Sequence, residues 1–304
     1  MTWFMWRQHR VQVMIAAALV VAFAVPVWIT GRHLADLLQA CRTGTTCGGI
    51  FQGYQGFNTV VDLTVIVPLL IGVFWGATII GRELESGTAT LAWTQSVTRR
   101  RWLISKLGVL FGFTLLCAGA VTGLVTWWSN THNAIVETRF AGLQFDIQAI
   151  APIGYALFAS ALGLAAGVLW GRALPAMATT IGGFVAVRLI VELWARPHYL
   201  EPITRILSFA KSDGIPNGAS AISTEVTRYG HVVSGPMPAP AQCISATSRP
   251  EMNECMHRLG YAIRATYQPA GRFWTFQWIE FGIFAGLAAV LTAVGVIAVL
   301  RREG

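Results

Sequence analysis

Charged residues are scarce in this chain of 304 residues: they make up 12% of it, whereas 54% of the residues are hydrophobic. Soluble domains carry about 25% charged residues. The composition therefore excludes a soluble protein and indicates an integral membrane protein. The net charge is +8, but the basic residues are scattered over loops and the ends of apolar runs. This distribution argues against a nucleic-acid partner.

Motifs for nucleotide binding and for hydrolysis are also lacking. The chain has no Gly-x4-Gly-Lys-Ser/Thr string, so it has no loop of its own to cradle ATP phosphates. HExxH is absent, and none of the histidines falls inside a predicted membrane span. A membrane-embedded enzyme, which needs converging acid and base groups, is therefore the weaker alternative. We expect no catalytic residue, no metal and no cofactor in this chain.

Six apolar stretches reach the length of about 20 residues that a helix needs to cross a bilayer. The first is too long for a simple signal peptide and lacks a cleavage site. We expect an all-α integral membrane protein with one transmembrane domain over residues 1–304. The stretches are roughly Val11–Ile29, Leu63–Ile80, Leu107–Trp128, Ala149–Trp170, Leu174–Trp194 and Phe276–Leu300.

Small residues recur every four positions in two of these stretches. Gly108/Gly112 and Gly119/Gly123 lie in the third span, and Ala159, Gly163, Gly167 and Gly171 lie in the fourth. Such spacing lets helices approach closely. The longer series in the fourth span is the better candidate for a tight contact, and generic packing is the alternative for any single pair.

Basic residues predict the orientation, because short cytoplasmic loops are rich in Arg and Lys. The even number of spans puts both termini on one side of the membrane, and we expect that side to be the cytoplasm. This choice places in the cytoplasm Arg7, Arg10, Arg82, Arg99, Arg100, Arg101, Lys106, Arg172, Arg301 and Arg302, against Arg32, Arg42 and Arg139 in the short outer loops.

Four of the cysteines form two pairs in the predicted outer loops: Cys41 with Cys47, and Cys243 with Cys255. Pairs outside and none in the cytoplasmic loops fit an oxidising exterior, so we expect two disulfides. A Cys243–Cys255 bridge would close a loop of about 13 residues and contribute on the order of 3 kcal/mol. Metal binding by Cys243, Cys255 and His257 is the alternative, although no fourth ligand is evident.

The loop at residues 81–106, GRELESGTATLAWTQSVTRRRWLISK, carries both acids and a cluster of bases. We predict that the second membrane helix runs on to Gly87, where a left-handed residue ends it. Thr88 can cap a short helix, Ala89–Gln95, and Thr98 can cap the helix that enters the membrane next. A short helix held between two spans can carry force from a partner into the membrane.

RELESGT followed by TQSVTRRRWLISKL closely resembles the cytoplasmic coupling loop of type-2 ABC transporter permeases. TYQPAGRFWTFQWIE, residues 266–280, resembles the start of the last span in a group of actinobacterial permeases. The alternative for the loop is a solvated segment whose bases only mark the cytoplasmic side. The resemblance implies ATPase-coupling roles for Arg82, Glu83, Glu85, Gly87, Thr88, Leu91, Trp93, Thr94, Gln95, Arg99, Arg100 and Arg101.

The resemblance also implies partners and a function. ATP and Mg would bind to a separate ABC ATPase subunit, present in two copies, and a second permease copy or close paralogue would complete the pathway. The chain would then be the permease of an exporter in a bacterial plasma membrane, moving a hydrophobic or amphipathic drug, antibiotic, lipid or peptide, as in multidrug resistance. A membrane sensor or scaffold with the permease fold is the alternative.

Charges inside the last two spans are the other unusual feature. Arg188 and Glu192 are four residues apart, so they share a helix face and can pair. Glu280 lies at a similar depth in the last span. An unpaired charge at mid-membrane costs roughly 2.5–3.5 kcal/mol or more, so we predict one cluster of the three in the outer leaflet. It would be either a gate on the export path or a structural ion pair.

The outer loop at residues 195–275 is the only sizeable polar region, and we expect it to form a small cap on the bundle. Its composition is rich in Pro and Ser, which is typical of extended chain. Pro250 opens a predicted helix from Glu251 to about Thr266. No pattern in this loop identifies the transported substrate.

Overall fold

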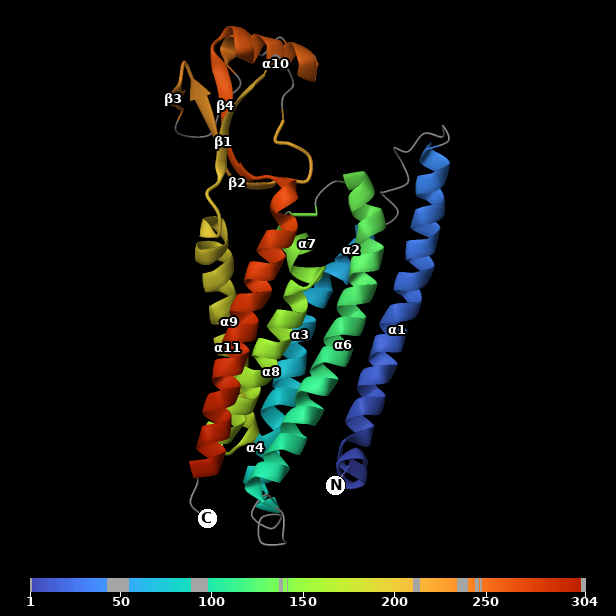
Figure 1. The fold of residues 1–304 in the computed structure, drawn as a ribbon. Coiled ribbons are helices and arrows are strands. Elements are labelled where there is room, and N and C mark those ends of the chain that lie inside the picture. The colour runs from blue at the N-terminus through green and yellow to red at the C-terminus, as the bar shows by residue number, and fades with distance from the viewer. Residues whose placement is uncertain are drawn as a thin grey trace.

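The structure, a computed structural model, describes residues 2–42, 55–88, 98–136, 139–140, 142–209, 214–233, 240–243, 246 and 248–301. Six helices in this part of the chain are long and apolar enough to cross a membrane. They lie side by side in a bundle with a small cap at one end (Figure 1). The prediction of an all-α integral membrane protein is confirmed. The predicted Ala89–Gln95 helix and the Cys41–Cys47 bridge lie outside the described residues.

We call the end of the bundle that carries the cap the outer end, and the opposite end the inner end. Helix α1 begins and α11 ends at the inner end, as the even number of spans requires (Figure 1). The spans are α1 (Thr2–Arg42); the segments α2 (Gln55–Asp62), η2 (Leu63–Ile66), α3 (Val67–Ile71), η3 (Gly72–Gly76) and α4 (Ala77–Glu85); α6 (Arg99–Val136); α8 (Ala151–Trp170); α9 (Ala173–Ile190) with η4 (Val191–Ala195) and η5 (Arg196–His198); and α11 (Phe273–Arg301).

Span two is divided into several helical segments, and its sequence accounts for the breaks. Pro68 lacks the N–H that a continuous helix needs at that position, and it lies in the first turn of α3. A π-helical turn, η3, follows between Gly72 and Gly76. π-turns of this kind are rare and often occur at functional sites. Here the wide turn lies where span two presses most closely against α8.

Glycines make the contact between span two and α8 a contact of backbones. A Cβ on Gly163 would lie 2.5 Å from the Gly72 carbonyl oxygen, and a Cβ on Gly72 would lie 2.6 Å from the Ala159 backbone. Gly167 approaches the Ala77 carbonyl in the same way, at 2.9 Å. The series of small residues in α8 therefore forms the tight contact that its spacing predicts. The glycines of α6 meet nothing within 4 Å.

Helix α8 is the centre of the bundle, and α1 is its edge. In the most apolar stretch of each helix, 72% of the residues of α8 are buried but only 6% of those of α1. Near the outer end, aromatic side chains of α8 and α11, among them Tyr155, Phe158 and Phe284, form the largest core cluster. Near the inner end, Trp75 of span two and Trp102 of α6 belong to a second cluster.

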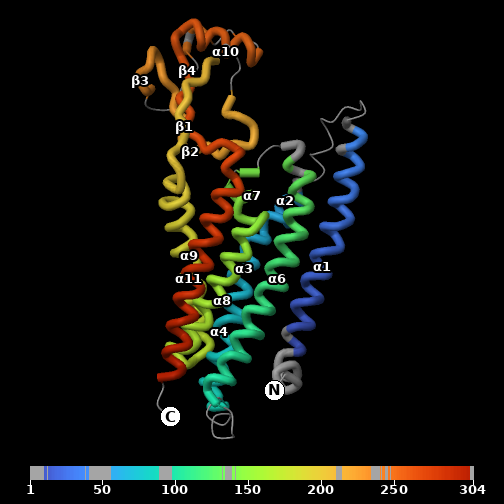
Figure 2. The backbone as a smooth tube through the Cα atoms, viewed as in Figure 1, coloured from blue at the N-terminus to red at the C-terminus, as the bar shows by residue number. Residues whose placement is uncertain are grey.

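The cap contains a sheet that the sequence analysis did not foresee. Its strands are β1 (Ile203–Ser208), β2 (Ser220–Arg228), β3 (His231–Val232) and β4 (Tyr261–Gln268). Their order is β1-β4-β2-β3, and all pairs are antiparallel, with Ile203 opposite Tyr267 and Arg228 opposite Tyr261. Figure 2 shows that the chain rises into the cap from α9 and returns through β4 to α11, so the two stems of the cap are spans five and six.

The predicted helix from Glu251 to Thr266 is wrong in its second half. Helix α10 (Arg249–Arg258) begins at a Ser248 cap and stops early, and residues 261–268 form β4 instead. Gly260 is the cause, because it takes a left-handed conformation with φ of +77° and ends the helix. The Tyr, Ile and Thr residues that follow favour a strand.

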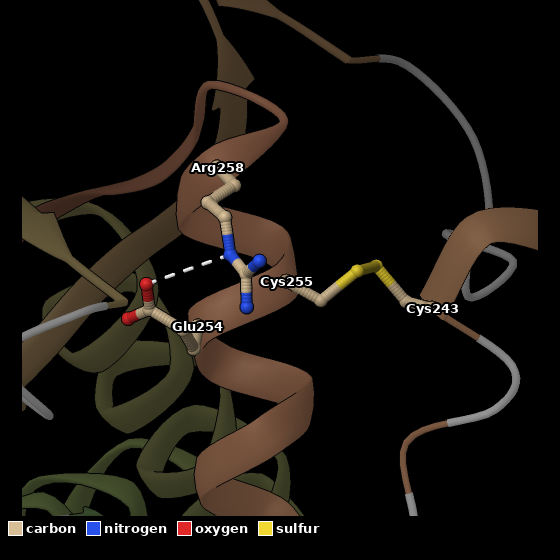
Figure 3. Close-up of a disulfide and its surroundings, with 4 residues drawn as sticks. All are labelled: Cys243, Glu254, Cys255 and Arg258. Atoms are coloured by element: carbon tan, nitrogen blue, oxygen red, sulfur yellow. Dashed lines mark ion pairs between the residues drawn. A yellow bond between two sulfur atoms is a disulfide. The ribbon is translucent and has the colours of Figure 1, made fainter.

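A disulfide fastens α10 to the short η6 helix (Ala241–Cys243), as Figure 3 shows. The sulfurs of Cys243 and Cys255 are 1.99 Å apart. Sulfurs joined in this way do not act as thiolate ligands. The part of the chain that the structure describes also contains no group of three or more His, Cys, Asp or Glu residues placed to hold a metal ion.

Candidate functional site

Glu83, at the inner end of span two, forms a buried ion pair. Its carboxylate contacts the Lys106 Nζ of α6, and the Lys106 side chain is only 1% exposed. Lys106 lies seven residues after the start of α6 at Arg99, so the pair joins spans two and three just inside the bundle. A buried ammonium group needs such a partner, because an unpaired charge away from water is costly.

Glu85 connects span two to span five. Its Oε2 accepts a hydrogen bond from the Ala173 backbone N–H at 3.0 Å. Ala173 is the first residue of α9, where backbone N–H groups have no partner within the helix and favour an anion. The close approach of Gly81 to Ala173, 3.4 Å for an added Cβ, keeps the two backbones together at this point.

The turns at Gly87 and Thr98 have the local geometry that the sequence predicts, whereas the predicted role of Thr88 as a cap concerns a helix outside the described residues. Gly87 has φ of +69°, which ends the helix of span two. The Thr88 hydroxyl lies 2.9 Å from the Ser86 hydroxyl and donates to the Glu83 carbonyl. Thr98 caps α6, because its Oγ1 accepts from the Arg101 N–H at 3.4 Å.

Most arginines of the loop are exposed. Arg82, Arg100 and Arg101 are exposed, and Arg99 is half-buried. The other residues that the resemblance gave an ATPase-coupling role, Leu91, Trp93, Thr94 and Gln95, lie outside the described residues. The described part of the inner loop therefore exposes three arginines, while Glu83 and Glu85 each bond to a group of the same chain.

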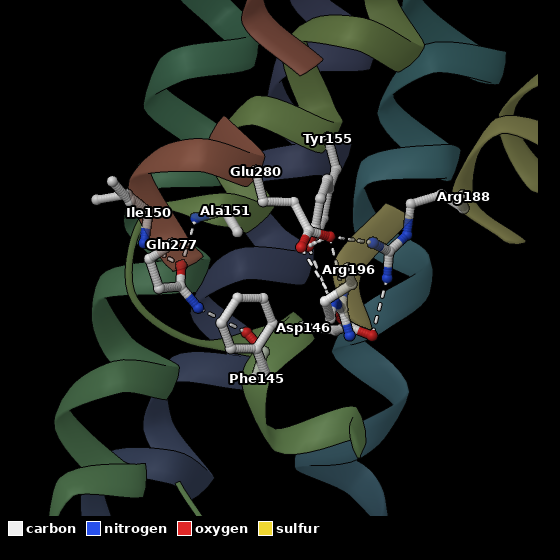
Figure 4. A network of polar contacts seen from close by, with 9 residues as sticks. All are labelled: Phe145, Asp146, Ile150, Ala151, Tyr155, Arg188, Arg196, Gln277 and Glu280. Carbon is white, nitrogen blue, oxygen red and sulfur yellow. Dashed lines mark hydrogen bonds and ion pairs between the residues drawn. The ribbon is translucent and has the colours of Figure 1, made fainter. Parts of the chain in front are cut away.

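At the outer end, four charged side chains and a tyrosine form a buried network (Figure 4). Arg188 pairs with Asp146 at 2.9 Å and with Glu280 at 3.1 Å. Arg196 contacts the same two carboxylates, at 2.5 Å and 2.7 Å. The Tyr155 hydroxyl donates to Glu280 at 2.7 Å. Two cations and two anions balance here, which is the condition under which charges persist inside a membrane protein.

Each charge of this network comes from a different element. Asp146 lies on the short helix α7 (Gly142–Ile147), Arg188 on α9, Arg196 on η5 and Glu280 on α11, and Tyr155 lies on α8 between them. The guanidinium of Arg188 also stacks over the Tyr155 ring at 3.9 Å. The network therefore fastens spans four, five and six to α7 directly beneath the cap.

Gln277 fixes the neighbouring turn between α7 and α8. Its Oε1 accepts from the backbone N–H groups of Ile150 and Ala151 at 3.2 Å and 2.8 Å, and its Nε2 donates to the Phe145 carbonyl at 2.9 Å. Figure 4 shows this amide next to the ion network. It satisfies free N–H groups at the start of α8, which would otherwise be buried without partners.

Two polar side chains just outside the spans have shifted pKa values. Burial raises the pKa of the Tyr199 phenol well above its ordinary value, and the nearby Glu280 carboxylate adds to the rise. Burial lowers the pKa of Arg139, whose guanidinium lies 4.1 Å from the centre of the Phe273 ring. The raised pKa keeps the Tyr199 phenol protonated near neutral pH.

The predicted cluster was right for Arg188 and Glu280 and wrong for Glu192. Glu192 is half-buried in η4 and takes part in none of the ion pairs among the described residues. Arg188 points instead into the interior, where Asp146 and Glu280 occupy its guanidinium. The four-residue spacing made a pair with Glu192 possible, but two better buried acceptors compete for the same cation.

Sequence reasoning missed Asp146, Arg196 and Tyr155. Asp146 was placed in an outer loop, and Arg196 was placed in the polar segment after span five. Both lie within a few residues of a span end, where a short helix can fold a charge back into the bundle. The predicted cluster held one cation, Arg188, and two anions, Glu192 and Glu280. This imbalance indicates that a further basic partner is needed.

A groove runs along the open side of the bundle between α1, span two and α6. Its volume is about 630 Å³, and its walls are almost wholly apolar, including Leu19, Phe74 and Phe113. Phe74 is 59% exposed there. Arg82 lies at the inner end of the groove. The groove therefore combines apolar walls with one cation at an end.

The fold and these sites define a multi-pass membrane protein with a buried ion pair near its inner end and a buried polar network near its outer end. A family model described as ABC-2 membrane transporter related matches residues 13–196. The match covers more than half of the chain, so the chain belongs to this family. Membership in this family indicates a permease-type membrane subunit and implies a partnership with an ABC ATPase. No curated protein and no solved structure matches the chain.

The matched segment runs from α1 to the start of η5. It includes the inner loop, the groove and four members of the outer network, Asp146, Tyr155, Arg188 and Arg196. The cap and α11, which supplies Glu280, lie beyond it. The part that the family defines therefore contains the inner loop and its contacts.

Proposed function

We propose that the chain is the permease of an ATP-driven exporter that moves a hydrophobic or amphipathic molecule out of a bacterial cell. In this proposal the inner end faces the cytoplasm, two ATPase subunits bind ATP and Mg, and a second permease copy completes the pathway. The observation that carries the proposal is the inner loop. Its two ends are anchored to spans two and three, and Glu85 links it to span five.

The inner loop supports a mechanical role. When ATP closes the two ATPase subunits, they would push on the segment between Thr88 and Thr98, which is joined to two spans at its ends. Exposed Arg82, Arg100 and Arg101 give the loop a positive surface for an acidic face of the ATPase. The movement would pass into the bundle and change access to the transport path.

The groove supports an amphipathic substrate. Its apolar walls favour a hydrophobic body, because burial of apolar surface is worth about 25 cal/mol per Å². Arg82 favours an anionic or polar group at the inner end. The outer network, with Arg188 and Glu280 at its centre, would keep the outer end closed until the ATPase moves the inner loop. Glu192 lies on the same span as Arg188 but is not part of the network.

The direct test is purification of the chain with its ATPase, followed by reconstitution into vesicles. We expect ATP turnover to rise when a transported amphipathic compound is added, and the compound to move to the side that carries the cap. An ATPase-free preparation is the control. If no ATPase copurifies with the intact chain, the proposal of an ABC permease role fails.

Deletion of residues 88–95 tests the role of the inner loop. We expect the shortened chain to reach the membrane but to lose substrate-stimulated ATP turnover, because the segment that receives the push is gone. A Tyr229→Ala variant in the exposed turn of the cap is the matched control, and it should keep this stimulation. Unchanged stimulation in the deletion variant would refute the coupling role.

A further inference from the structure

We propose that Glu83 and Glu85 are positioning residues that act on their own chain, through Lys106 and the first turn of α9, and not through contact with the ATPase. The proposal builds on the proposed function and assigns the two acids of the inner loop a role within the permease. It divides the loop into exposed cations that meet the partner and two acids that transmit movement through bonds within the permease, Glu83 to Lys106 and Glu85 to Ala173.

The first observation is the burial of Lys106. Its side chain is 1% exposed, and the side chain of Glu83 is 12% exposed. A partner subunit cannot reach Lys106, so any effect of the pair on coupling must arise inside the permease. The pair fixes the end of span two to α6 on one side of the inner loop and therefore sets the angle at which the loop leaves the membrane.

The second observation is the hydrogen bond from Ala173 to Glu85. The bond ends on the first free N–H of α9. A carboxylate at a helix N-terminus is stabilised by the aligned peptide dipoles of that helix. Span five contributes no residue to the loop itself, so this bond and the close approach of Gly81 to Ala173 form its link to the loop.

Together the two contacts make the inner end of span two a junction. Glu83 holds the start of α6 and Glu85 holds the start of α9, while Gly163 and Gly72 hold α8 by backbone contact. A displacement of the loop would therefore reach spans three, four and five at once.

A double-mutant cycle tests the Glu83–Lys106 pair without reference to transport. Thermal unfolding is measured for the unaltered chain, for the single variants Glu83→Gln and Lys106→Met, and for the double variant that combines them. We expect each single change to lower the unfolding midpoint and the combined change to lower it by less than their sum, because the second change removes a charge already left unpaired. Full additivity would overturn the role of the pair.

Two substitutions of similar size test Glu85 in the complex with the ATPase that copurifies with the unaltered chain. Glu85→Gln keeps an oxygen that can accept from Ala173, whereas Glu85→Leu removes it. We expect Gln to retain stimulated ATP turnover, and Leu to lose it while still binding the ATPase. A contact with the ATPase predicts instead that both variants lose affinity, by about tenfold, or 1.4 kcal/mol.

The two arms separate this inference from the proposed function. If the intact chain binds no ATPase, the proposed permease role fails. The double-mutant cycle still decides whether Glu83 and Lys106 stabilise the fold as a pair. If the intact complex is stimulated but Glu85→Gln loses both affinity and stimulation, only the positioning role of Glu85 is overturned.

Discussion

At the scale of the residue, the buried charges in the described part of the chain, Lys106, Asp146, Arg188 and Glu280, all form ion pairs. Glu280 has no exposed surface, yet it receives contacts from Arg188, Arg196 and Tyr155. Lys106 follows the same rule at the inner end through Glu83. Since removing one partner leaves the others buried and uncompensated, each member of such a set depends on the rest.

We expect Glu280→Gln to lower the free energy of unfolding by about 3 kcal/mol, because two guanidiniums then share one carboxylate. Thermal unfolding of the purified protein checks it. Glu192→Gln, one helical turn from both Arg188 and Arg196 but outside the ion network, is the matched control and should change stability by less than about 0.5 kcal/mol. Equal effects of the two changes would show that the network does not stabilise the bundle.

At the scale of the element, glycine spacing has two different meanings in neighbouring helices. In α8, Gly163 and Gly167 face span two at backbone distance, whereas Gly108 and Gly112 of α6 have open space in front of them. The four-residue spacing is the same in both helices. Only the neighbour that each face meets distinguishes a close contact from an ordinary helix surface.

We expect Gly163→Ala to destabilise the protein by about 1–3 kcal/mol, because the added methyl group would overlap the Gly72 carbonyl and force span two away from α8. Gly112→Ala is the control and should be neutral or stabilising by up to about 1 kcal/mol, since Ala favours helix over Gly. Thermal unfolding of both variants, side by side, checks the prediction. If Gly163→Ala were neutral, span two and α8 would not be in backbone contact.

At the scale of the whole molecule, the structure sets the two ends apart by their chemistry. The inner end combines exposed arginines with the junction at Glu83 and Glu85. The outer end carries the ion network and the cap, which Figure 1 shows beyond the ends of α9 and α11. A force applied to the inner loop would cross the bundle through span two, α8 and α9. The proposed orientation places that loop where a cytoplasmic ATPase can reach it.

Labelling of single added cysteines checks the orientation. We expect a membrane-impermeant maleimide to modify Tyr229→Cys, in the cap, on intact cells. The same reagent should modify Thr88→Cys, in the inner loop, only after the cells are permeabilised. Both positions are exposed in the structure, and the chain without an added cysteine is the background control. If Thr88→Cys reacted on intact cells, the loop could not meet a cytoplasmic ATPase.

The sequence by itself determined the membrane class, the six spans and the local turns of the inner loop. These properties depend on hydropathy summed over a stretch, or on one residue and its neighbours, as at Gly87 and Thr98. The same local reasoning failed at Gly260, where a single left-handed glycine ends α10 and a strand begins. That signal was present in the sequence and was overlooked.

Only the tertiary structure decided which charges meet. Asp146, Arg188, Arg196 and Glu280 come from four elements, and the spacing along one helix favoured Glu192 as the partner of Arg188 instead. The tertiary structure also shows that Glu85 accepts a hydrogen bond from Ala173 at the start of α9, which is far away in the sequence. The physical reason is that pairing inside a membrane depends on which side chains the packed helices bury together, and spacing within a single helix does not contain that information.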